Sequence, residues 1–187
     1  MHDPRIDKLA QLLVNYSVEV RPGDRVAIMA PEIAKPLSDA IYVEALKAGG
    51  NPIVLVPQPS ELLFKHGSRQ QIEYVPLPLA HITEEYEVRI SVLAEENTRS
   101  LSGIDPQKAA WHSAARRYLL KTMMQRSASG AFRWTIAPYP TNAMAQDADM
   151  SLEDYTDFIF DACLPDQNDP VGYWQAFSEK QEYISTG

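Results

Sequence analysis

Residues 25–56 read RVAIMAPEIAKPLSDAIYVEALKAGGNPIVLV and decide the fold. The run at 25–30 is short and apolar, as is typical of a buried strand. Pro36 then opens a helix with apolar residues at helical spacing, and the glycine pair at 49–50 ends it, because glycine accepts the left-handed conformation of a helix end. A second apolar run follows at 52–56. A strand, a helix and a strand within about thirty residues form a right-handed crossover, so the two strands are predicted to be parallel.

The same alternation of strands and helices continues along the chain. Apolar and polar residues alternate over 87–93, and residues 132–137 combine aromatic and branched side chains, so both segments are predicted as strands. Between them Asp105 is an N-cap candidate, and Pro106 stands where a helix accepts proline, which predicts a long helix to about Met124.

Three further helices are indicated by their first residues. Asp3 before a proline predicts a first helix to about Ser17, residues 151–154 fit a capping box, and residues 169–170 begin another helix. The expected fold is therefore α/β, a mainly parallel sheet of at least four strands with helices on both faces and extra C-terminal helices. We expect one domain over residues 1–187, since that length supports one substantial core.

The overall charge excludes two classes of partner. The formal net charge is −8, so the chain has no basic field for nucleic acid or for an anionic membrane surface. A local basic cluster at 116–126 lies on the long predicted helix, where a solvated helix face is the usual explanation. We expect neither nucleic acid nor membrane as a partner.

Cysteine usage and the first residues predict a cytoplasmic protein. Cys163 is the single cysteine, so no internal disulfide forms, and it follows an apolar run that favours a buried filler over a nucleophile. The residues after Met1 lack the apolar core of a signal peptide, and no stretch approaches the roughly 18 apolar residues of a membrane span.

Motifs for catalysis and for cofactor binding are missing from the sequence. His2, His66, His81 and His112 have no paired spacing that would signal a zinc site. The turn after the first strand, residues 30–36, contains no glycine to let a phosphate approach the backbone, so a dinucleotide site is disfavoured despite the Rossmann-like order of elements. We therefore assign no catalytic residue, no metal ligand and no cofactor to this chain.

Three segments carry a resemblance to a known family. Residues 21–26, followed by residues 36–37 and 48–50, are similar to the opening strand, helix and glycine stop of that family. Residues 95–106, EENTRSLSGIDP, look like the loop after the third strand and the start of the long helix in the thermophilic-type metallo-aminopeptidases, the family of aminopeptidase T and aminopeptidase S. The strongest match runs from Arg133 and Trp134 to Tyr155 and closes with Phe158, residues 162–163 and residues 169–171. The chain therefore resembles the N-terminal domain of this leucyl aminopeptidase-like family.

The resemblance implies a function that belongs to a longer protein. Family members are about twice as long, and their second domain carries a two-metal site of zinc or cobalt class that removes N-terminal amino acids from peptides. No position of this chain corresponds to a metal ligand. We therefore expect an inactive fragment that packs against a catalytic domain or another copy of itself, and that meets peptide substrate only in the full-length context.

Five residues are the candidates for that contact. Arg133 and Trp134 are residue types enriched at interfaces, and Tyr173, Trp174 and Phe177 lie on the last predicted helix, where a lone domain would expose them. The alternative is a stand-alone module that binds a small molecule or a protein on a Rossmann-like fold. Such a module would have a closed polar surface and a ligand pocket at the carboxyl ends of its strands.

Overall fold

The computed structural model describes residues 3–185. Its sheet has four parallel strands in the order β2-β1-β3-β4, so the predicted parallel sheet is confirmed. The strands are β1 (Arg25–Met29), β2 (Asn51–Leu55), β3 (Val88–Leu93) and β4 (Arg133–Pro138). The helical elements are α1 (Pro4–Leu12), η1 (Leu13–Ser17), η2 (Glu32–Ala34), α2 (Lys35–Lys47), α3 (Ser60–His66), α4 (Arg69–Glu73), α5 (Leu77–Glu85), α6 (Pro106–Ala128), α7 (Asn142–Asp147), α8 (Leu152–Cys163) and α9 (Pro170–Ser185).

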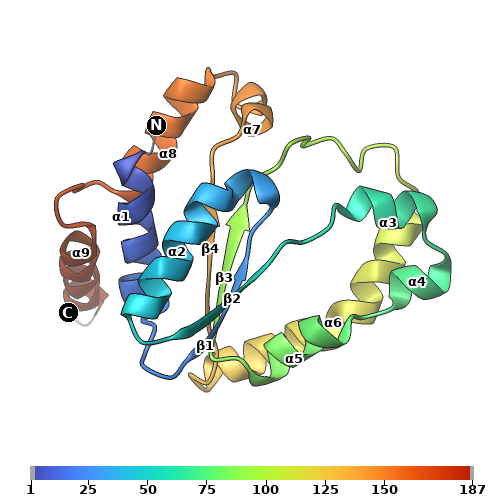
Figure 1. Ribbon diagram of the computed structural model, residues 1–187, viewed down its shortest axis with the longest axis horizontal. Coiled ribbons are helices and arrows are strands. Elements are labelled where there is room, and N and C mark those ends of the chain that lie inside the picture. Colours follow the sequence, from blue (N-terminus) through green and yellow to red (C-terminus); the bar gives the residue numbers. More distant parts are fainter. Residues whose placement is uncertain (1–2, 186–187) are drawn as a thin grey trace.

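One face of the sheet is packed against α1 and α2 and forms the core. Val26 and Ile28 of β1 and Val88 and Ile90 of β3 are fully buried, in one cluster with apolar residues of both helices. Each such side chain stabilises the fold by about 1.5 to 3 kcal/mol relative to full exposure. The core therefore lies between these two strands and the two helices that Figure 1 shows beside them.

The opposite face is only partly covered. Helices α3 to α6 lie on this side of the sheet in Figure 1. Arg89 of β3 reaches Met123 of α6 here, with 3.0 Å between the Nη2 and Sδ atoms. Nearer the carboxyl ends, Leu93 and Ile136 on the same face remain exposed. Parallel sheets are normally covered on both faces, so this face has room for another layer.

Helix ends follow the capping signals in the sequence. The Asp3 carboxylate accepts the Arg5 N–H at 2.9 Å, the Asp105 carboxylate accepts the Gln107 N–H at 2.9 Å, and the Ser151 hydroxyl accepts the Asp154 N–H at 3.1 Å. Each bond satisfies an N–H that has no partner inside the first helical turn. Gly49 ends α2 with a φ of +83°, a conformation that favours glycine.

The last helix returns to the first one. Helix α9 contacts α1 and η1 although about 160 residues separate them in the chain. The Tyr16 hydroxyl donates to the Trp174 carbonyl at 3.2 Å and also bonds the Ser178 hydroxyl. The C-terminal helix is thus held by polar contacts as well as by packing.

An ion pair joins the beginnings of β1 and β3 and makes stability depend on pH. The Glu87 carboxylate accepts the Arg25 backbone N–H at 2.8 Å and the Arg25 guanidinium at 2.6 and 3.1 Å. These hydrogen bonds lower the pKa of Glu87 to about 2. The folded state favours the ionised form of Glu87. The contribution of this ion pair to the free energy of unfolding is therefore complete above the unfolded pKa of about 4.3, and it is lost as the pH falls toward 2.

We therefore expect Glu87→Gln to be less stable than the wild type at pH 7, and the difference to shrink as the pH falls from 5 to 2. Urea midpoints measured at several pH values check this. A difference that stays constant down to pH 2 would contradict the assigned role of Glu87.

Candidate interdomain surface

The crevice where this fold class usually binds ligands carries no phosphate loop. The strand order reverses between β1 and β3, and the loops that follow them, residues 30–34 and 94–105, meet this switch point. The loop after β1 contains Pro31 and Glu32 and no glycine. In the loop after β3, the Glu95 carbonyl accepts the Thr141 hydroxyl at 2.6 Å, which is a structural contact.

The histidines do not gather into a metal site. His66, His81 and His112 lie on α3, α5 and α6, and His2 lies outside the described residues. Burial, with help from the Arg116 charge, lowers the pKa of His112, whose ring meets Phe64 edge to face. Among residues 3–185 no three or more histidine, cysteine, aspartate or glutamate side chains come together as metal ligands would. These residues do not fit a two-metal hydrolytic centre.

Arg133 makes its contacts within the chain. Its Nε donates to the Val18 carbonyl at 2.7 Å, and its Nη2 pairs with the Asp24 carboxylate. The side chains of Arg133 and Asp24 are only 19% and 11% exposed. The Asp24 carboxylate also accepts the Arg21 N–H at 2.7 Å. Arg133 therefore ties β4 to the turn before β1, and an additional role toward a neighbouring domain stays a prediction.

Trp134 lies on the partly covered face of the sheet. It pairs in register with Arg89, and both side chains are half-buried. Ile136, two residues further along the same face, is 48% exposed. Ile136 is not among the interface residues predicted from the sequence, although strand alternation over 133–138 places it beside Trp134 on this face.

The three aromatic residues of α9 form one cluster. Trp174 meets Tyr173 and Phe177 edge to face, with ring centres 5.7 and 5.6 Å apart, and the Tyr173 and Phe177 rings stack. The Trp174 indole N–H donates to the Cys163 carbonyl at 2.9 Å, so this ring faces the chain itself. Tyr173 and Phe177 remain 40% and 41% exposed. The helix thus presents two aromatic rings to its surroundings.

A small cavity connects the cluster with β4. It measures about 240 Å³ and has mostly apolar walls, supplied by α1, η1, β4, α8 and Trp174 of α9. Ile136 and Cys163 are among its lining residues. Burial raises the pKa of the Cys163 thiol, which keeps it protonated and inert at neutral pH. The cavity lies on the α1 side of β4, opposite the face that carries the Trp134 and Ile136 side chains, so it connects the aromatic cluster to the edge of β4 and not to that face.

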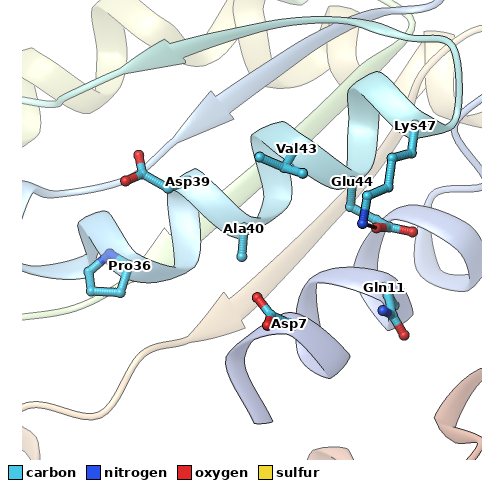
Figure 2. A pocket seen from close by; sticks show the side chains of 8 residues that line it. All are labelled: Asp7, Gln11, Pro36, Asp39, Ala40, Val43, Glu44 and Lys47. Atoms are coloured by element: carbon cyan, nitrogen blue, oxygen red, sulfur yellow. Dashed lines mark hydrogen bonds and ion pairs between the residues drawn. The ribbon is translucent and has the colours of Figure 1, made fainter. Parts of the chain in front are cut away.

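A larger groove of about 500 Å³ runs between α1 and α2. Figure 2 shows Asp7 and Gln11 of α1 facing α2 across it. Of the charges on α2, Asp39 pairs with Lys35 at 2.8 Å, and Glu44 pairs with Lys47 at 3.0 Å. Exposed pairs of this kind are ordinary features of helix surfaces, so the groove indicates no particular chemistry.

No helix within residues 3–185 is long and apolar enough to cross a membrane.

Comparison with known proteins places the chain in a family. The sequence model of the thermophilic metalloprotease (M29) family matches residues 2–186. Among curated proteins, Aminopeptidase 2 of Geobacillus stearothermophilus is 26% identical over 193 residues, which cover 95% of this chain and 46% of the relative. Aminopeptidase T of Thermus thermophilus is 22% identical over 197 residues, covering 96% and 48% respectively. The chain therefore spans about half the length of these relatives.

A solved structure has the same fold. Wild-type AmpT from Thermus thermophilus superposes with a TM-score of 0.75 at 18% sequence identity, over 98% of this chain and 48% of that one. The α/β sheet described above is thus found in a solved protein. With a family match over nearly its whole length, the chain belongs to the thermophilic metalloprotease (M29) family.

Proposed function

We propose that this chain is the non-catalytic N-terminal domain of a metal-dependent aminopeptidase and that it packs against a catalytic domain. One observation carries the proposal: the alignments use 95% and 96% of this chain but only 46% and 48% of the two aminopeptidases. In this proposal the other half supplies the two-metal site, of zinc or cobalt class, and peptide is bound only when both halves are present. The cytoplasmic location predicted from the sequence belongs to the same proposal.

The surface that meets the catalytic domain is proposed to run along the β4 edge of the sheet, with Trp134 and Ile136 on one face of the strand and Tyr173 and Phe177 of α9 on the other side. We call it the β4-side surface. Three of these residues expose between 40% and 48% of their area, and Trp134 is half-buried. Aromatic residues with one open side are enriched in the buried centres of protein interfaces. β4 is an edge strand, and Ile136 lies on the partly covered face of the parallel sheet, which supports the same assignment.

The alternative, a stand-alone binding module, has less support. A module of this fold would bind its ligand at the carboxyl ends of the strands, where the loop after β1 lacks glycine and the loop after β3 is tied by Thr141. The exposed aromatic rings of α9 are more readily explained by a protein partner than by a small ligand.

Binding to the half of Aminopeptidase 2 that this chain does not match tests the β4-side surface. We expect the purified chain to bind the unmatched half of Aminopeptidase 2, and Tyr173→Glu to weaken that binding about 30-fold, because a carboxylate would be buried against apolar groups. Tyr118→Glu on α6 is the matched control, since Tyr118 is similarly exposed, at 47% against 40% for Tyr173. Isothermal titration calorimetry measures both affinities.

Equal weakening by Tyr173→Glu and Tyr118→Glu would contradict the β4-side surface. No binding by the unaltered chain would contradict the proposed packing itself, and would favour the stand-alone module.

A further inference from the structure

Arg89 of β3 carries its charge in a poorly hydrated place on the partly covered face of the sheet. It lies in register with Trp134 of β4, and its guanidinium carbon is 5.8 Å from the centre of the Phe132 ring. Its Nη2 atom contacts the Met123 sulfur at 3.0 Å, and its Nε atom is buried without a hydrogen-bond partner among the described residues. Burial lowers the pKa of Arg89, although a guanidinium stays charged at neutral pH. A buried cation costs free energy unless an anion pairs with it.

Helix α6, which lies on the same side of the sheet in Figure 1, is also cationic. It contains five basic residues and no acidic residue, although the whole chain carries −8. The basic residues are Lys108, Arg116, Arg117, Lys121 and Arg126. The ion pairs formed within residues 3–181 involve neither these five side chains nor Arg89. Positive charge is therefore concentrated on this side of an acidic chain.

Two arginines of α6 bond to backbone carbonyls rather than to carboxylates. Arg116 donates to the Tyr74 carbonyl at 2.9 Å. Arg126 donates to the carbonyls of Thr83 and Tyr86 at 2.9 and 2.8 Å. A carbonyl is a neutral acceptor, so these bonds fix the side chains without neutralising their charge. An acidic partner would complement this concentration of positive charge.

The sheet face beside Arg89 is apolar and open toward the carboxyl ends of the strands. Leu93 and Ile136 on this face are 50% and 48% exposed, and Trp134 is half-buried. A free inorganic anion could pair with Arg89, but it would leave these apolar side chains in contact with water. A protein surface that carries a carboxylate among apolar groups would cover the side chains and pair with the cation. The chemistry of this face therefore favours a protein partner.

We propose that the catalytic domain presents a carboxylate side chain to the Arg89 guanidinium where it covers this face of the sheet. The inference rests on the proposed function, and it adds the chemistry of one contact within the β4-side surface. Because the Nε atom is buried, the carboxylate approaches the terminal nitrogens of the guanidinium. The apolar groups of both partners around the pair keep water out, which strengthens the attraction between the two charges.

The stability of the isolated chain gives the first test. We expect Arg89→Met to raise the urea midpoint, because methionine packs between Phe132 and Met123 and removes a buried cation that has no anion. Arg21→Met is the control: it removes the same charge from a side chain that is 64% exposed, so its midpoint should equal that of the wild type. A lower midpoint for Arg89→Met would overturn the inference, because Arg89 would then stabilise the chain through its present contacts alone.

Binding to the unmatched half of Aminopeptidase 2 gives the second test, measured by isothermal titration calorimetry. We expect Arg89→Met to raise the dissociation constant about 50-fold, because the carboxylate of the partner would then be buried without a cation. Arg89→Lys should recover part of the affinity, since lysine keeps the charge but lacks the planar fork of donors. Arg21→Met should bind as the wild type does. Circular dichroism checks that the three variants fold.

The outcomes separate this inference from the proposed function. Equal binding by the wild type and Arg89→Met would overturn the inference and leave the proposed packing of the two halves intact. No binding by the wild type would overturn the proposed packing, and this inference with it. If Arg89→Met binds normally, and inorganic phosphate raises the urea midpoint of the wild type but not of this variant, Arg89 holds a free anion and the inference is wrong.

Discussion

Replacing Asp24 by alanine should lower the free energy of unfolding by about 3 to 5 kcal/mol, because the change leaves the Arg133 guanidinium in a poorly hydrated place without its anion. The Asp24 carboxylate pairs with Arg133 and accepts the Arg21 N–H at 2.7 Å, and its side chain is only 11% exposed. The substitution therefore removes an ion pair between β4 and the turn before β1, and also a hydrogen bond inside that turn. Urea unfolding followed by circular dichroism measures the loss.

A surface ion pair gives the control for this prediction. Asp39→Ala removes the partner of Lys35 on the exposed side of α2, where both side chains are 60% exposed, and should cost less than about 1 kcal/mol. The double variant Asp24→Ala with Arg133→Met should be more stable than Asp24→Ala alone, because the unpaired cation is removed as well. A loss for Asp24→Ala no larger than that for Asp39→Ala would contradict the role of Asp24.

The sequence predicted the sheet because each strand is bounded by a clear signal. Glycine at 49 and proline at 36 delimit α2, and the four strands begin and end within one or two residues of the predicted ranges. The first helix ends at Ser17 as predicted, but its last turn is a π-helix, in which the Val18 N–H bonds the Leu13 carbonyl at 3.1 Å. No side-chain pattern marks that wider turn, since it is set by backbone bonding.

The segment between β2 and β3 was not predicted. It contains α3, α4 and α5, each of nine residues or fewer, and helices so short show too few turns for a periodic pattern to appear. One signal was available: Ser68 and Gln71 have capping-box spacing, and both of the reciprocal bonds of that motif form at the start of α4. Arg116 of α6 then donates to the carbonyls of Ile72 and Tyr74, a long-range contact that no local pattern indicates.

The candidate surface could be predicted only in part. Helical spacing placed Tyr173, Trp174 and Phe177 on the last helix, but it could not show that Trp174 turns inward to the Cys163 carbonyl while the other two rings stay exposed. Arg133 appeared as an interface residue because arginine is common at interfaces, whereas its contacts lie within the chain, with Val18 and Asp24. Whether such a side chain faces the chain itself or its surroundings depends on partners that are far apart in the sequence.

Another prediction concerns catalysis by this chain. We expect no hydrolysis of amino-acyl arylamides by the purified chain with added zinc, cobalt or manganese, because two-metal hydrolysis needs a cluster of ligands that holds both ions a few ångström apart. His66, His81 and His112 lie on three different helices, and within the described part of the chain no cluster of metal-ligating side chains forms. Carboxylates on helix surfaces lack the fixed geometry that turns weak cation binding into catalysis.

The most direct measurement is therefore arylamide hydrolysis by the chain alone, by the unmatched half of Aminopeptidase 2 alone, and by their mixture, each with and without metal. The account predicts no turnover by the chain, and metal-dependent turnover by the mixture that exceeds that of the isolated half and disappears with a chelator. Metal-dependent turnover by the chain alone, removed by chelator and surviving repurification, would falsify the claim that this domain is non-catalytic.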